Sequence, residues 1–147
     1  MYYNIAKLSD VNPDLVIRLK KYCYAINGCC LTVHTELGPF LNEYIYQDAL
    51  EILLCERHIK YEREYHFAID FHGRPIKHTH SVDFLVDDNI IVECKAVETL
   101  CIEHRQQLWN YMRLTKKPIG ILYNFSPIKD QSEHYFFDHE RNTIFMF

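Results

Sequence analysis

The chain has 147 residues, of which 48% are hydrophobic, 14% aromatic and 24% charged, and its formal net charge is −4. This length suits one domain with a sizeable core, so we expect a single domain over residues 1–147, and the composition excludes collagens, coiled coils and disordered tails. The net acidity excludes a protein that holds nucleic acid by bulk positive charge alone, but it is compatible with a site of acids that binds metal ions.

The N-terminal segment MYYNIAKLSD lacks the charged start, apolar stretch and cleavage site of a secretory signal. No apolar run approaches the roughly 20 residues that a membrane span requires. We therefore expect a cytoplasmic protein, or one in a nucleus or viral factory, that is neither secreted nor bound to a membrane. The six cysteines show no C-x-x-C spacing. This argues against a zinc protein and favours buried free thiols.

Two helices are predicted in the first part of the chain. Apolar residues recur at helical spacing from about Asp10 to Glu36, with Asp10 as the candidate cap and Pro13 in the first turn. Gly38-Pro39 is expected to end this helix. A second helix is predicted from Leu41 to about Arg57.

The remaining elements are mostly strands. They are predicted at Lys60–Phe71, His80–Val86 and Ile90–Ala96, then a helix at Ile102–Leu114, a buried strand at Pro118–Asn124, and a hairpin of His134–Phe137 with Thr143–Phe147. The order α-α-β-β-β-α-β plus a C-terminal hairpin predicts an α+β fold, in which helices in α/β/α layers pack on a mixed sheet.

The segment SVDFLVDDNIIVECKA carries Asp83, Glu93 and Lys95 inside predicted strands, where charge is costly. A three-residue loop at 87–89 would place Asp83 opposite Glu93 on one sheet face, with Cβ atoms about 4.5–5.5 Å apart. Lys95 would share that face. A two-residue loop would instead place Asp83 opposite Cys94 and separate the acids.

Two converging carboxylates are unfavourable unless a proton or a cation lies between them. A hard divalent ion such as Mg²⁺ takes oxygen ligands and would fill that place. A lysine beside the pair can orient a water or stabilise charge on a phosphate. The pattern therefore indicates a metal-dependent phosphodiester-cleaving site, and the alternative is a buried Asp–Lys–Glu ion network without chemistry.

Residues on two helices can complete such a site. His104, Gln107 and Tyr111 lie at i, i+3 and i+7, on one helix face. Glu43, near the start of the second helix, is either a third carboxylate of the site or a first-turn acid favoured by the helix dipole. Gln107 is either a site residue or a solvated polar residue.

Basic residues cluster in three places and form either solvated faces or a surface for the nucleic-acid backbone. The clusters are Arg57, Lys60 and Arg63; Arg74, Lys77, His78 and His80; and Arg105, Arg113, Lys116 and Lys117.

Five segments, in order, resemble the small GxxExxY branch of the PD-(D/E)xK nuclease superfamily. The first segment is VHTELGPF, which is followed by Glu43 and Tyr46 of the E-x-x-Y motif. The other four are SVDFLV with Asp83, IVECKAVE with Glu93 and Lys95, HRQQLWNY with His104, Gln107 and Tyr111, and GILYNF. The resemblance runs from about Gly28 to Phe125. One departure is Phe40, which occupies the position of the family's motif glycine and is expected to crowd the mouth of the site.

The resemblance implies a restriction-endonuclease-like core that binds one or two Mg²⁺ or Mn²⁺ ions. Asp83 and Glu93 would bind metal, with the backbone carbonyl of Cys94 as a further ligand and Glu43 binding directly or through water. Lys95 would position the attacking water. The supporting residues would be Gln107, Tyr111, His104 and Tyr46.

The expected function is therefore that of a metal-dependent nuclease acting on nucleic acid, with DNA the expected substrate. No sequence-reading module is visible, so specificity would need a homodimer or a partner protein. The alternative is a catalytically inactive module of the same fold that binds nucleic acid or protein.

Overall fold

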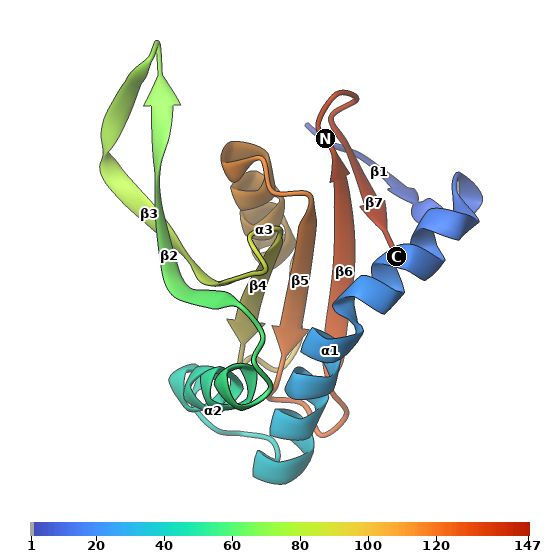
Figure 1. Ribbon diagram of the computed structural model, residues 1–147, viewed down its shortest axis with the longest axis vertical. Helices are drawn as coiled ribbons and strands as arrows, with labels where there is room; N and C mark the ends of the chain where they lie inside the picture. The colour runs from blue at the N-terminus through green and yellow to red at the C-terminus, as the bar shows by residue number, and fades with distance from the viewer. Residues whose placement is uncertain (1) are drawn as a thin grey trace.

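The computed structural model describes residues 2–147, which form a mixed seven-stranded sheet with helices on both faces (Figure 1). The strands run in the order β1-β7-β6-β5-β4-β3-β2. In chain order the elements are β1 (Asn4–Lys7), a 3₁₀ helix (Leu8–Asp10), α1 (Pro13–Leu37), α2 (Glu43–Glu56), β2 (Tyr61–Phe71), β3 (Arg74–Val86), β4 (Ile90–Lys95), α3 (Ile102–Thr115), β5 (Ile119–Asn124), β6 (Gln131–Asp138) and β7 (Thr143–Met146).

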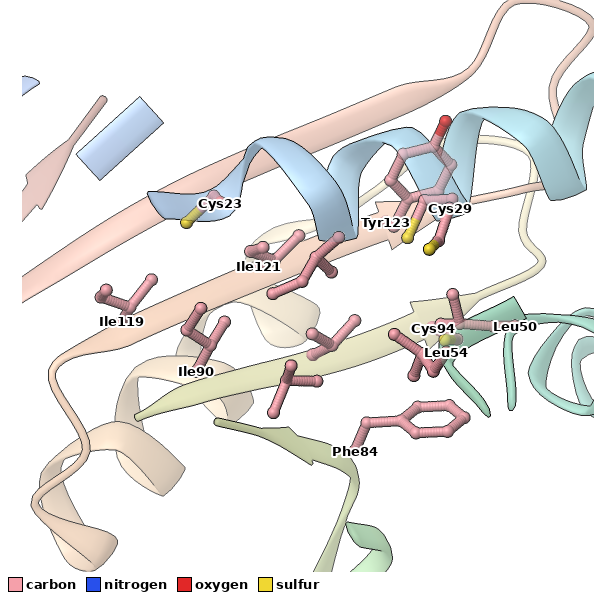
Figure 2. Packing of buried hydrophobic residues seen from close by; sticks show 14 of the residues in the cluster. Cys23, Cys29, Leu50, Leu54, Phe84, Ile90, Cys94, Ile119, Ile121 and Tyr123 are labelled. Atoms are coloured by element: carbon pink, nitrogen blue, oxygen red, sulfur yellow. The ribbon is translucent and has the colours of Figure 1, made fainter. Parts of the chain in front are cut away.

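The sheet separates two hydrophobic cores. On one face α1 and α2 cover β4 and β5, and Figure 2 shows Cys23 and Cys29 of α1 and Leu50 of α2 packed around Ile121 and Cys94. On the other face α3 covers the sheet through a second cluster that includes Leu108, Trp109 and Met112. This arrangement confirms the predicted α+β fold of helices on a mixed sheet, consistent with a restriction-endonuclease-like core.

At the N-terminal end, one prediction was wrong and one strand was not predicted. Helix α1 begins at Pro13, and its cap is Asn12, whose Oδ1 accepts a hydrogen bond from the Leu15 amide at 3.1 Å, rather than Asp10. The sequence prediction also missed β1, which pairs in parallel with β7. The end of α1 was predicted correctly, because Gly38 adopts a φ of 75° there.

The hairpin of β2 and β3 is longer than predicted. β3 begins at Arg74 rather than His80, and the turn consists of His72 and Gly73, whose φ angles of 53° and 74° suit a two-residue hairpin. In Figure 1 the distal half of this hairpin rises away from the other strands. We call residues 65–82 the β2–β3 arm.

Strands β4 and β5 are parallel, so their carboxyl ends meet at one edge of the sheet, where Lys95 pairs with Asn124. Figure 1 shows α2 at the same end. Polar residues that follow these strands therefore lie near the start of α2.

The cysteines are all free, but only four of the six are buried, since Cys55 and Cys101 are exposed. Within residues 2–147, no helix is both long and apolar enough to cross a bilayer.

Candidate active site

The pairing of β3 and β4 has the predicted register. Val86 pairs with Ile90 across a three-residue loop, and the ladder continues through Leu85 with Ile91 to Phe84 with Val92. In that loop Asp87 and Asp88 have φ angles of 51° and 59°, which Asp tolerates better than most residues. The next pair in this register is Asp83 and Glu93, and the alternative with Asp83 opposite Cys94 is excluded.

At Asp83 the carboxylates replace the main-chain ladder. The amide of Asp83 donates to Oε1 of Glu93 at 3.3 Å, and the amide of Cys94 donates to Oδ2 of Asp83 at 2.8 Å. Each acid therefore binds a main-chain amide of the opposite strand. The two side chains converge at the point where β3 and β4 separate, and Glu93 is only 5% exposed.

Burial and mutual repulsion dominate the electrostatics of this pair, and the nearby Lys95 offsets them only in part. Burial raises the pKa of Glu93 well above its ordinary value, and the nearby Asp83 charge raises it further. Burial also raises the pKa of Asp83, although the Cys94 amide and Lys95 oppose that increase. A cation between the carboxylates would stabilise both charged forms.

Lys95 is connected to helix α3 by a chain of hydrogen bonds. Its Nζ donates to Oε1 of Gln107 at 3.3 Å, and Nε2 of Gln107 donates to the Tyr111 hydroxyl at 3.2 Å. Burial, followed by the Glu93 charge, raises the pKa of Tyr111. The structure therefore brings Gln107 and Tyr111 to the same side of the sheet as Lys95 and the acid pair.

His104 has a contact that the sequence pattern did not predict. Its Nδ1 accepts a hydrogen bond from the main-chain amide of Cys101 at 3.1 Å, within a capping box at the start of α3. Burial and the charge of Lys95 lower the pKa of His104. His104 thus interacts electrostatically with Lys95, while its ring caps the beginning of the helix.

Glu43 is the first residue of α2 and is half-buried near the acid pair. Its pKa is raised by burial and then by the Asp83 charge, and Lys95 lowers it. Across residues 2–147, no three His, Cys, Asp or Glu side chains lie close enough together to hold a metal ion. Glu43 is therefore near Asp83 without forming a three-ligand cluster.

Tyr46 holds the loop that leads into α2. Its buried hydroxyl donates to the carbonyl of Gly38 at 2.7 Å and accepts from the amide of Leu41 at 3.1 Å, and its ring stacks on Phe125 at 4.9 Å. These contacts fix the loop 38–42 and hence the start of the helix that carries Glu43.

Phe40, where the resemblance in sequence would place a glycine, has a φ of 69°, a conformation that glycine adopts without strain. Its side chain is 74% exposed and lies at a surface hollow of about 470 Å³ with Ser126, Pro127 and Ile128. The ring therefore points to solvent, and the hollow's lining includes Glu98 but none of the candidate metal ligands.

Sequence reasoning assigned no role to Asn124, although it is a fully buried polar residue in an apolar strand. Its side chain accepts from the Val97 amide at 3.0 Å and donates to the Val97 carbonyl at 2.8 Å. It thereby holds the segment that follows Lys95. The sequence feature that could have indicated this role is a single Asn inside the apolar run GILYNF, because a buried polar side chain needs hydrogen-bond partners.

Among the residues that the structure describes, three of the eleven basic residues in the predicted clusters form ion pairs with carboxylates. Lys60 pairs with Asp88 at 2.6 Å, Arg63 with Asp48 at 2.7 Å, and Arg105 with Glu133 through two bonds of 2.7 Å. The carboxylates neutralise the charge of these three residues, which leaves less positive charge there for a phosphate backbone.

The donors fit a hard divalent cation. Asp83 and Glu93 supply two carboxylates at one point, and Mg²⁺ in proteins is commonly held by one or two carboxylates together with waters and substrate phosphates. The main chain of Cys94 lies beside them, since its amide contacts Asp83.

Comparison with known proteins bears on the fold and the family of the chain. No curated protein matches the chain. The crystal structure of SSO0001 matches with a TM-score of 0.52 and 22% identity, over 68% of this chain and 54% of that one, and this likeness concerns the fold alone. The chain thus spans about half the length of SSO0001. The model of the PD-(D/E)XK nuclease superfamily matches residues 20–135, so the chain belongs to the PD-(D/E)XK nuclease superfamily.

Proposed function

We propose that the protein is a metal-dependent nuclease that hydrolyses phosphodiester bonds of nucleic acid, with DNA as its substrate. The observation that carries this proposal is the convergence of Asp83 and Glu93 at the end of the β3–β4 ladder, with Lys95 on the same strand. We further propose that it belongs to the GxxExxY branch, and that residues 1–147 act as one domain. A homodimer or partner protein would supply sequence specificity.

In this proposal Asp83 and Glu93 hold Mg²⁺ or Mn²⁺, with the Cys94 carbonyl as a further ligand and Glu43 binding through water. The bound metal would supply charge stabilisation for the phosphate and activation of the attacking water. Glu43 is assigned an indirect role because it lies near Asp83 without completing a three-ligand cluster.

Five side chains of the protein would position the attacking water, stabilise charge on the phosphate or hold the site in place. Lys95 positions the attacking water and stabilises negative charge on the phosphate as the bond breaks. Gln107 holds the Lys95 ammonium through its amide oxygen and is itself held by Tyr111, which reduces the number of orientations that Lys95 can adopt. Tyr46 and His104 support the site by fixing the starts of α2 and α3.

The first experiment measures metal binding. Calorimetric titration with Mg²⁺ and Mn²⁺ is expected to show binding to the wild type and none to Asp83→Asn, which keeps the side-chain shape. Equal binding by both proteins would contradict the assignment of Asp83 as a ligand.

The second experiment measures cleavage of single- and double-stranded DNA and RNA, with and without EDTA. Lys95→Ala is expected to lose at least about 100-fold in rate, the lower end of what one positioned general acid–base or charge-stabilising group contributes. Lys129→Ala is the matched control, because Lys129 is an exposed lysine on the loop after β5. Cleavage that survives Lys95→Ala would refute the proposed mechanism.

A second candidate function is a catalytically inactive module of this fold that binds nucleic acid or protein. The observation that favours it is that, in residues 2–147, the acid pair has no third carboxylate within ligand distance. Metal binding without cleavage of any of the four substrates would support this candidate over the nuclease.

A further inference from the structure

The β2–β3 arm extends beyond the rest of the sheet. Within residues 2–147, strand β3 pairs with β4 over Phe84–Val86 alone, and from Val82 to Arg74 it pairs with β2, the edge strand, and with no other strand. Residues 70–81 are all exposed. Figure 1 shows the arm as a two-stranded ribbon that rises clear of the other strands.

The size of this ribbon matches a groove of duplex DNA. From Tyr65 paired with Val82 to Phe71 paired with Arg74, β2 advances about 20 Å at about 3.3 Å per residue, and β3 uses two more residues over the same span. The major groove of B-form DNA is about 12 Å wide and admits a two-stranded β-ribbon. A register shift between Ala68 and Asp70 marks a bulge, which increases the twist of such a ribbon.

The charge of the ribbon is complementary to phosphate. The segment from His72 to Val82 contains Arg74, Lys77 and three histidines but no acid, in a chain whose net charge is −4. Within the described part of the chain neither Arg74 nor Lys77 forms an ion pair. This contrasts with Lys60, Arg63 and Arg105, which pair with carboxylates. The nearest acid on the arm is Asp70 of β2, opposite Pro75.

The arm is also continuous with the candidate active site. Phe67 and His80 pair across its base, and their rings lie 5.5 Å and 6.2 Å from the ring of Tyr111. Tyr111 is hydrogen-bonded to Gln107, which contacts Lys95. Asp83 follows Val82 directly, so the arm ends at the acid pair.

We propose that the β2–β3 arm binds duplex DNA by entering its major groove, so that the phosphate backbone beside the groove reaches Asp83 and Glu93. This inference rests on the proposed nuclease function and deepens it, because it names B-form duplex DNA as the substrate. The major groove of A-form RNA is too narrow and deep for such a ribbon. Duplex RNA is therefore expected to bind more weakly than DNA of the same sequence.

The test measures binding in EDTA, where cleavage does not occur. Fluorescence anisotropy with a labelled DNA duplex is followed from about 50 to 200 mM salt. Each contacted phosphate contributes about −0.9 to the slope of log K against log salt. The double variant Arg74→Gln/Lys77→Gln removes two such contacts, so we expect its slope to be less negative than that of the wild type by about 1.8. The control Arg18→Gln/Lys21→Gln removes the same charge from exposed positions of α1 and is expected to keep the wild-type slope.

Thermal unfolding of both double variants checks that they are folded. An arm variant with the wild-type slope, or duplex RNA bound as tightly as DNA, would overturn the inference. DNA cleavage by the wild type with an unchanged slope in the arm variant would overturn the arm proposal alone. A reduced slope in a protein that cleaves nothing would support the arm proposal and overturn the nuclease.

Discussion

The replacement Tyr46→Phe tests how the loop 38–42 is held. The change keeps the stack on Phe125 but removes the hydroxyl that joins the Gly38 carbonyl and the Leu41 amide. Leaving a polar group without its partner costs about 1–3 kcal/mol, and the lower end applies to each group here because both residues are only half-buried. We therefore expect the free energy of unfolding to fall by about 2 kcal/mol, which corresponds to about 4–8 °C in Tm for a chain of this size.

The assay is urea unfolding followed by circular dichroism, with Tyr44→Phe as the matched control. Tyr44 lies two residues earlier and is 60% exposed, and its hydroxyl accepts a long hydrogen bond of 3.5 Å from the Asn42 side chain. Its loss is expected to change stability by less than about 0.5 kcal/mol. If Tyr46→Phe also stays within that range, or if both variants fall equally, the Tyr46 hydroxyl does not hold this loop.

Three further predictions concern single sites. Phe40→Gly is expected to stabilise the protein by about 0.5–1 kcal/mol in thermal unfolding, since it relieves a φ of 69° at an exposed position, and a lower Tm would contradict this. Glu93→Gln is expected to raise stability in EDTA by about 0.5–2 kcal/mol by removing a buried charge, and to abolish the gain in Tm that Mg²⁺ gives the wild type. An unchanged Mg²⁺ response would exclude Glu93 as a ligand. Burial, followed by the Lys20 charge, lowers the pKa of His134, so its contribution to stability is complete above about pH 6.5 and declines as the pH falls toward the folded-state pKa. The difference in unfolding free energy between wild type and His134→Gln is therefore expected to shrink between about pH 7 and pH 5, and a constant difference would contradict the shift.

The part of the site that lies on one hairpin was predictable from sequence. Loop length fixes strand register, so the sequence allowed two registers, and the structure has the one in which a three-residue loop at 87–89 places Asp83 against Glu93. The helix face shared by Gln107 and Tyr111 followed from spacing in the same way. Local pattern determines these relations because the partners are close in sequence.

Relations between distant segments were not predictable in this way. β1 has four residues and pairs with β7 at the other end of the chain, so neither its length nor its pattern indicated a strand. The exposed half of β3 has no buried face, and the alternation that reveals a strand was therefore missing. The position of Glu43 near Asp83 depends on how α2 packs, which the sequence of α2 alone does not determine.

The bonds between Asp83, Glu93 and the main chain have a consequence for how sequences of this type are interpreted. Each acid serves as a rung between β3 and β4 where the regular ladder has ended. A descendant that had lost its metal or its substrate would still benefit from both side chains, because alanine at either position would leave an amide of the opposite strand without an acceptor. The acceptor oxygens of the two side chains therefore stabilise the sheet, whereas their negative charges, which the sheet does not need, are the part that points to a metal site. Lys95, whose ammonium donates to the Gln107 side chain of α3 rather than to a strand of the sheet, is the more informative marker of retained chemistry.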